Sequence, residues 1–147
     1  MKYKHAIIFV LIILSISLTG CFLFPPRDNT AEWTVMVYLD ADNNLESASI
    51  DDINEMEIVG STTEVNIVVQ ADRIPGYDIS NNNWTTTRRY YITQDFDLVQ
   101  INSLLIGDLG ELNMGDSQTL IDFTNWAVTN YPAKKYFRLL IYYVIYY

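Results

Sequence analysis

Two strand-like runs, the first of them almost continuously apolar, are separated by a helix-like segment and constrain the fold of this chain more than any other feature. Residues 33–39 (WTVMVYL) and 64–73 (EVNIVVQADR) are rich in β-branched and aromatic side chains. Such runs are typical of strands buried on both faces, as in a parallel sheet. Between them, apolar residues at positions 45, 48, 53, 56 and 59 form one helical stripe, which ends at Gly60. The pattern predicts a strand–helix–strand unit, and therefore an α/β fold with a mainly parallel sheet flanked by helices.

Polar side chains follow the first apolar run directly. Asp40, Asp42 and Asn43 are candidate pocket-lining residues, because ligands of open α/β sheets bind at the carboxyl ends of the strands. Asp40, Asp42 and Asn44 also have the spacing of a calcium-binding loop, but Leu45 occupies the position that requires glycine. A strand-end turn that caps the following helix explains the same residues. We therefore predict no metal site.

The remaining segments predict a hairpin, a second helix and a third strand. Residues 74–84 are rich in Pro, Gly and Asn, as loops are, and residues 85–93 (TTTRRYYIT) predict an exposed or edge hairpin. Asp116 is the expected N-cap of a helix that Pro132 ends. Its apolar stripe is Leu120, Phe123, Ala127 and Tyr131. Residues 136–147 (YFRLLIYYVIYY) then predict a third buried strand.

The first 21 residues have the layout of a lipoprotein export signal. Lys2 and Lys4 precede an apolar run over residues 6–18, which is too short for a comfortable membrane span. The following LTGC resembles a lipobox, so we predict a signal peptide over 1–20, acylation of Cys21 and a tether over 21–32. The protein would then be exported and lipid-anchored at the membrane or cell surface. A plain signal peptide with an unrelated cysteine, or an uncleaved anchor helix, is the alternative.

The charge of the chain excludes several partners. Without residues 1–20, seven Lys and Arg stand against eighteen Asp and Glu, a formal net charge of −11. This balance argues against nucleic acid as a partner and against electrostatic docking on anionic lipid, both of which need clustered basic residues. The acidic residues of the first helix, which are Asp51, Asp52, Glu55 and Glu57, are expected on a solvated face.

The chain contains no recognisable catalytic set. Its one histidine, His5, lies in the export signal, and its one cysteine, Cys21, lies at the predicted anchor. A Cys–His dyad or a Ser–His–Asp triad therefore cannot form in the folded domain. No phosphate-binding or dinucleotide-binding glycine loop is present either. We predict no catalytic residue in this chain.

Five segments, in this order and spacing, resemble the N-terminal part of the clostripain-like cysteine peptidases. They are WTVMVYLDADNNLE, DINEMEIVGS, VNIVVQADR, RRYYIT and DLGELNMGDSQTLIDFTNWAVTNYPAKKY, and the resemblance covers residues 33–136. It implies a caspase-like α/β fold, export, and cleavage of proteins or peptides after Arg or Lys by a His–Cys dyad. No position of this sequence matches either member of the dyad. Calcium is a candidate cofactor of full-length members, and no residue here can be assigned to it.

Residues 137–147 depart from the family pattern where the catalytic His is expected. We therefore expect residues 33–147 to be an incomplete caspase-like domain: the N-terminal fragment of a surface-anchored endopeptidase, inactive by itself, left by a frameshift or a truncated gene. A natural short variant is the rival explanation. Two further hypotheses stay open, a non-catalytic surface lipoprotein that binds a ligand or partner, and a complementary C-terminal chain that completes the sheet.

Overall fold

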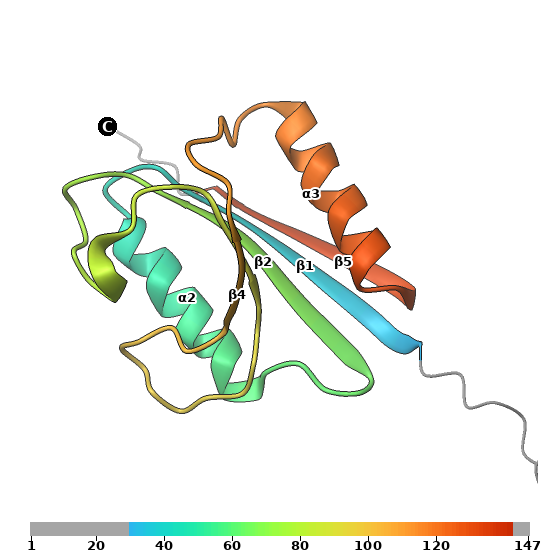
Figure 1. The fold of residues 1–147 in the computed structure, drawn as a ribbon. Helices are drawn as coiled ribbons and strands as arrows, with labels where there is room; N and C mark the ends of the chain where they lie inside the picture. The colour runs from blue at the N-terminus through green and yellow to red at the C-terminus, as the bar shows by residue number, and fades with distance from the viewer. Residues whose placement is uncertain (1–29, 143–147) are drawn as a thin grey trace, which may run out of the picture.

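A mixed five-stranded sheet with one main helix on each face makes up the described part of the protein (Figure 1). The computed structural model describes residues 30–142, so the predicted signal peptide, Cys21 and nearly all of the tether lie outside it, as do residues 143–147. In chain order the elements are β1 (Ala31–Ala41), α2 (Glu46–Val59), β2 (Val65–Arg73), the short 3-10 helix η2 (Asn81–Asn83), β3 (Arg88–Tyr91), β4 (Leu104–Asp108), α3 (Ser117–Asn130) and β5 (Ala133–Tyr142). Within the described range, none of the helices has the length and apolarity needed to cross a membrane.

The strand order is β4-β3-β2-β1-β5, and β1 lies between two parallel partners. β3 and β4 extend the sheet on the other side of β2 through antiparallel pairing. The apolar run of β1 is buried because strands flank it on both edges and helices cover both of its faces. The predicted α/β class and the parallel strand–helix–strand unit are confirmed.

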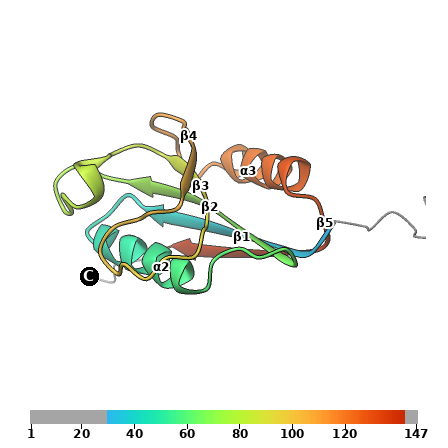
Figure 2. The same ribbon diagram turned by 60° about the horizontal axis from the view of Figure 1, so that its bottom comes forward.

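The two helices each close a hydrophobic core on one face of the sheet (Figure 2). Successive strand residues point to opposite faces, so β1 contributes to both cores. On the α2 face the buried core is Val37, Leu39, Ile50, Ile53, Val69, Ala71, Trp84, Tyr90 and Ile92. On the α3 face it is Met36, Tyr38, Val68, Met114, Phe123 and Ala127.

The predicted stripe of α2 is wrong at both ends. Leu45 and Val59 are exposed, whereas Glu46 and Glu57 are fully buried together with Ile53. Glu57 was expected on the solvated face with the other acidic residues of the helix. The apolar residues alone did not predict the buried side of α2, because that side carries two carboxylates. Hydrogen-bonding partners from other parts of the chain allow these carboxylates to be buried.

The segment predicted as an edge hairpin is an interior strand with a distant partner. β3 pairs with β2 on one side and with β4 on the other, and its Tyr90 is buried. The edge strand is β4, whose Leu104 and Leu105 are exposed. The predicted N-cap of the second helix is confirmed, since the Asp116 carboxylate accepts a hydrogen bond from the Gln118 N–H at 2.9 Å.

β5 forms as predicted and pairs with β1, but it is not a buried strand. Phe137 is 52% exposed and Leu139 is 41% exposed. The reason is its position: β5 is the last strand of the sheet among residues 30–142, so nothing in that range pairs with its outer edge.

Candidate functional site

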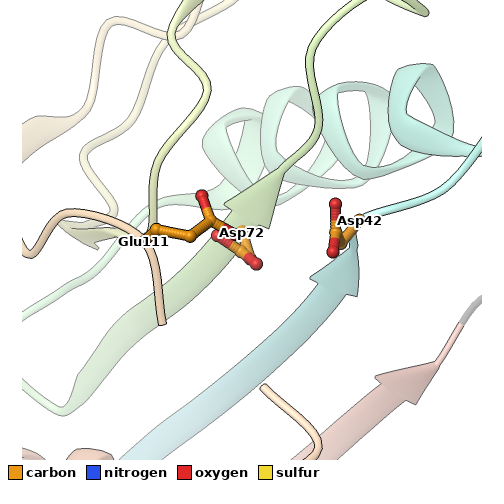
Figure 3. Close-up of side chains that lie close together, drawn as sticks. All are labelled: Asp42, Asp72 and Glu111. Carbon is orange, nitrogen blue, oxygen red and sulfur yellow. The ribbon is translucent and has the colours of Figure 1, made fainter. Parts of the chain in front are cut away.

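An acidic cavity of about 520 Å³ lies at the carboxyl ends of β1 and β2 (Figure 3). The three candidates from the sequence, Asp40, Asp42 and Asn43, all line it. The other lining residues are Asp72, Glu111, Leu112, Asn113, Met114 and Gly115. The topology explains the location, because the first and second strands run parallel and end at the same edge of the sheet.

Three elements bring carboxylates together in this cavity. Asp40 and Asp72 are register partners on β1 and β2, and Asp42 follows directly after β1. Glu111 comes from the loop between β4 and α3. Carboxylate oxygens of Asp42, Asp72 and Glu111 all lie within 4.8 Å of one another, with the side chains arranged as in Figure 3. No basic residue lines the cavity, so it presents a concentrated negative charge.

Asp72 is the buried member of this group. Its side chain accepts a hydrogen bond from the Thr87 hydroxyl at 2.7 Å, and the residue is 1% exposed. Burial raises the pKa of Asp72 to about 7, and repulsion from Glu111 and Asp42 acts in the same direction. Burial also raises the pKa of Asp40 from its ordinary value. The cavity therefore holds more negative charge as the pH passes through neutrality.

Thr87 and Tyr38 hold the loop that carries Glu111. The Thr87 hydroxyl accepts a hydrogen bond from the Leu112 N–H at 3.2 Å, while it donates to Asp72. The buried Tyr38 hydroxyl donates to the Met114 carbonyl at 3.0 Å. Hydrogen bonds from β1 and from the residue before β3 thus fix this wall of the cavity.

Arg73, which follows Asp72 on β2, does not neutralise the negative charge of the cavity. Its guanidinium is buried against Glu46, with Nε donating to the Glu46 carboxylate. A second donor nitrogen reaches the Asp78 carbonyl at 2.8 Å, and the cation lies 4.8 Å from the centre of the Trp84 ring. Successive residues of a strand point to opposite faces, so Asp72 and Arg73 serve different sites.

Asn43 forms a local turn and does not cap the helix. Its side-chain oxygen accepts a hydrogen bond from the Leu45 N–H at 2.9 Å, which is an Asx turn. Leu45 occupies the N-cap position of α2 and makes no side-chain capping bond. The interpretation of residues 40–44 as a helix cap is therefore wrong, although the strand-end turn is confirmed.

Sequence reasoning missed Asp72 and Glu111. Asp72 was visible in principle, because it ends the second apolar run as Asp40 ends the first, and parallel pairing places such positions side by side. Glu111 had no comparable signal, because its position depends on the path of a loop.

The cavity is suited to a cationic group. A guanidinium or ammonium group could bind there by charge-assisted hydrogen bonds, and oxygen ligands of this kind also suit a hard divalent cation. Asp42, Asp72 and Glu111 are the residues that could hold such an ion. The described residues include neither histidine nor cysteine, so they provide no thiol nucleophile or imidazole base.

Comparisons with known proteins agree on one family. The model of the clostripain family matches residues 37–143. Clostripain from Hathewaya histolytica is 30% identical over 129 residues, which are 78% of this chain and 24% of that protein. This chain thus spans about a quarter of the length of that relative.

Solved structures share the fold. A cysteine protease from B. fragilis has a TM-score of 0.56 and 24% identity, covering 78% of this chain and 90% of that one. A clostripain from Bacteroides thetaiotaomicron, solved with a peptide inhibitor, has a TM-score of 0.59 and 14% identity, covering 79% and 93%. A secreted cysteine protease from the same species has a TM-score of 0.56 and 23% identity, covering 75% and 29%. The clostripain-type α/β fold expected from the sequence is confirmed.

Proposed function

The chain belongs to the clostripain family of peptidases, and we propose that it is the N-terminal part of a surface-anchored peptidase domain of this family. It contributes part of the substrate site and none of the catalytic residues. The acidic cavity at the carboxyl ends of β1 and β2 is the observation that carries this proposal.

The cavity is the proposed recognition site for a basic side chain of a protein or peptide substrate. A guanidinium group carries five N–H donors in a planar fork, which carboxylates accept with favourable charge and geometry. Asp42, Asp72 and Glu111 provide several acceptor oxygens, and no cation of the chain competes for them among the lining residues. Cleavage after Arg or Lys by the complete peptidase is the activity that such a site would serve.

The catalytic dyad is proposed to come from a complementary C-terminal polypeptide. His5 and Cys21 are the chain's one histidine and one cysteine, and both precede the described residues. The outer edge of β5, which no strand covers among residues 30–142, is a place where further strands could join the sheet. Without such a partner, the chain is proposed to be inactive.

Export and anchoring rest on the N-terminal sequence. Acylation of Cys21 would hold the protein at the membrane through its lipid chains. The secretion of one structural neighbour supports export. A detergent phase-partition assay tests the anchor. We expect the wild-type protein in the detergent phase and Cys21→Ala in the aqueous phase. Equal partition of the two proteins would rule the anchor out.

Binding of a labelled peptide tests the recognition site. We expect a fluorescein-labelled peptide with a single Arg to bind at least about tenfold more tightly than the same peptide with citrulline, because charged hydrogen bonds contribute about 1.5–3 kcal/mol. Citrulline keeps the shape of arginine and lacks its charge. The double variant Asp42→Asn, Glu111→Gln should remove most of this preference in fluorescence anisotropy. Equal affinity for both peptides would refute the proposed site.

A non-catalytic binding module is the second candidate function. The observation that favours it is the pair of packed cores, one on each face of the sheet, within residues 30–142. A binding module must fold alone, whereas a peptidase fragment need not. Cooperative unfolding of the isolated chain, together with no preference for the arginine peptide, would favour this second function.

A further inference from the structure

A single buried threonine, Thr87, links two walls of the acidic cavity. It directly precedes β3 and is fully buried. The antiparallel register of β2 and β3, continued by one residue, places Thr87 opposite Asp72. The register of β3 and β4, continued in the same way, places it beside the loop that carries Glu111. Thr87 therefore lies between two of the three carboxylates that converge in the cavity (Figure 3).

Thr87 holds the chain on both sides of Glu111. Its N–H donates to the Gly110 carbonyl at 2.8 Å, and its carbonyl accepts a hydrogen bond from the Leu109 N–H at 2.9 Å. Its side-chain hydroxyl accepts from the Leu112 N–H at 3.2 Å. Gly110 has a φ of +71°, a left-handed conformation that favours glycine. These contacts fix the backbone that carries the Glu111 side chain.

The hydroxyl proton of Thr87 is directed at Asp72. A threonine hydroxyl has one proton to donate and two lone pairs with which to accept. The proton is donated to the Asp72 carboxylate at 2.7 Å, while a lone pair accepts the Leu112 N–H. One oxygen atom therefore sets both the position of a carboxylate on β2 and the position of the loop next to Glu111.

Repulsion among the carboxylates explains why such a link would matter for binding. Oxygens of Asp42, Asp72 and Glu111 lie within 4.8 Å of one another, and no basic residue lines the cavity. Like charges at this distance repel, and the exposed Asp42 and Glu111 can lower this repulsion by moving apart in water. A site whose acceptors are already held together loses less free energy to ordering when a cation binds.

We propose that Thr87 is a positioning residue for the recognition of a basic side chain: its hydroxyl holds Asp72 and the Glu111 loop in the arrangement that accepts a guanidinium group. The inference rests on the proposed recognition site and adds to it a residue that does not line the cavity. Thr87 would act through the two carboxylates and without touching the cation.

Substitutions at Thr87 separate the effect of the hydroxyl from that of side-chain volume. Thr87→Val removes the hydroxyl and keeps the shape, whereas Thr87→Ser keeps the hydroxyl. Anisotropy with the full chain in non-ionic detergent measures the affinities for the single-Arg peptide and its citrulline counterpart. We expect Thr87→Val to weaken the arginine peptide about tenfold and the citrulline peptide less than about twofold, and Thr87→Ser to keep the wild-type preference.

A matched control comes from α3. The Thr124 hydroxyl donates to the Leu120 carbonyl of the same helix at 2.8 Å. Thr124→Val should leave both affinities within about twofold of the wild-type values. Circular dichroism establishes that each variant is folded.

A double-mutant cycle shows whether Thr87 acts through Asp72. Asp72→Asn removes the negative charge that the Thr87 hydroxyl positions. In this background we expect Thr87→Val to weaken the arginine peptide by less than about threefold, compared with about tenfold in the wild-type background. A role of Thr87 in folding alone would give the same loss in both backgrounds.

Hydrogen exchange of the wild-type chain provides a test that needs no variant. A cation bound between Asp72 and Glu111 would hold the loop against β2, so the arginine peptide should slow amide exchange at Leu112 by roughly threefold or more. The citrulline peptide should not. This measurement decides the matter if Thr87→Val does not fold.

The outcomes distinguish a failure of this inference from a failure of the recognition site. Equal affinity of the wild-type chain for the two peptides would refute the recognition site and the role of Thr87 with it. A wild-type preference for arginine that Thr87→Val keeps, or that Thr87→Ser loses equally, would overturn the role of Thr87 alone. A loss that is additive with Asp72→Asn, or unchanged exchange at Leu112, would also overturn it.

Discussion

At the scale of single residues, the two neighbours Asp72 and Arg73 show opposite solutions to burying a charge. Asp72 is buried beside other carboxylates and keeps its proton more readily, whereas Arg73 is buried against Glu46 and Asp78. The first arrangement makes the site sensitive to pH, and the second holds the loop after β2 in place. Each gives a distinct prediction for stability.

The raised pKa of Asp72, to about 7, makes the folded state less stable as the pH rises. An unfolded Asp titrates near about pH 4, so between about pH 4 and 7 the unfolded chain releases a proton that the folded chain retains. The free energy of unfolding therefore falls across this window and levels off above it. Asp72→Asn should raise Tm at pH 8 by about 4–8 °C, which corresponds to about 1 kcal/mol, and should have little effect at pH 4.

Differential scanning fluorimetry at the two pH values measures this difference. Asp51→Asn, at an exposed position of α2, is the control and should show no comparable dependence on pH. A gain in Tm for Asp72→Asn that is the same at pH 4 and pH 8 would contradict the ionisation argument.

Removing Arg73 should destabilise the protein strongly. Arg73→Met leaves the fully buried Glu46 carboxylate without its cation, and a broken buried pair of this kind costs about 3–5 kcal/mol. Lys134→Met removes an exposed partner of Glu32 and should cost less than about 1 kcal/mol. Urea denaturation measures the free energy of unfolding of each variant. An equally small decrease in both variants would show that Arg73 is not structurally important.

At the scale of elements, α2 supports a loop through Glu57, which was expected on the solvated face of the helix but is buried. Glu57 is buried, and its Oε1 accepts hydrogen bonds from the N–H groups of Asn102 at 2.9 Å and Ser103 at 2.5 Å. Burial raises the pKa of Glu57, while these hydrogen bonds act in the opposite direction. The helix thus fixes the segment that leads into β4.

Glu57→Ala should loosen this segment selectively. The two N–H groups would lose their acceptor, at a cost of about 1–3 kcal/mol, so amide hydrogen exchange at Asn102 and Ser103 should accelerate by roughly tenfold or more. Glu55→Ala, on the same helix, is the matched control. Exchange at these two amides that is unchanged by Glu57→Ala would show that other contacts hold the loop.

The elements also show which features the sequence could predict. The strand–helix–strand unit was predictable because β1 contains an almost continuous apolar stretch and β2 is rich in β-branched residues, and the sequence also indicated Asp116 as the start of a helix. The buried side of α2 was not, because Glu46 and Glu57 are stabilised by Arg73 and by backbone groups from remote segments. Of the residues that line the acidic cavity, Asp40, Asp42 and Asn43 were predicted from the end of the first strand, whereas Asp72 and Glu111 were missed.

At the scale of the whole molecule, the first residue of β1 and the acidic cavity lie at opposite ends of the sheet. β1 begins at Ala31, and the cavity lies beyond its other end at Ala41. Eleven residues of strand separate these ends, or about 35 Å at roughly 3.3 Å per residue.

The exposed apolar residues of β5 are expected to lower the stability and solubility of the isolated chain. Within residues 30–142 no strand pairs with the outer edge of β5, and an unpaired apolar edge promotes association between chains. We expect residues 21–147 to be marginally stable, with soluble protein lost as the concentration rises. A cooperative thermal melt of a soluble monomer, independent of concentration, would contradict this expectation.

We have proposed that this chain recognises a basic side chain and does not cleave beside it. The test is mass spectrometry of the single-Arg peptide after incubation with a preparation of residues 21–147 that binds it by anisotropy. We expect the bound peptide to stay intact. Cleavage after the arginine by residues 21–147 alone would contradict the proposal, because a His–Cys dyad needs a histidine and these residues include none.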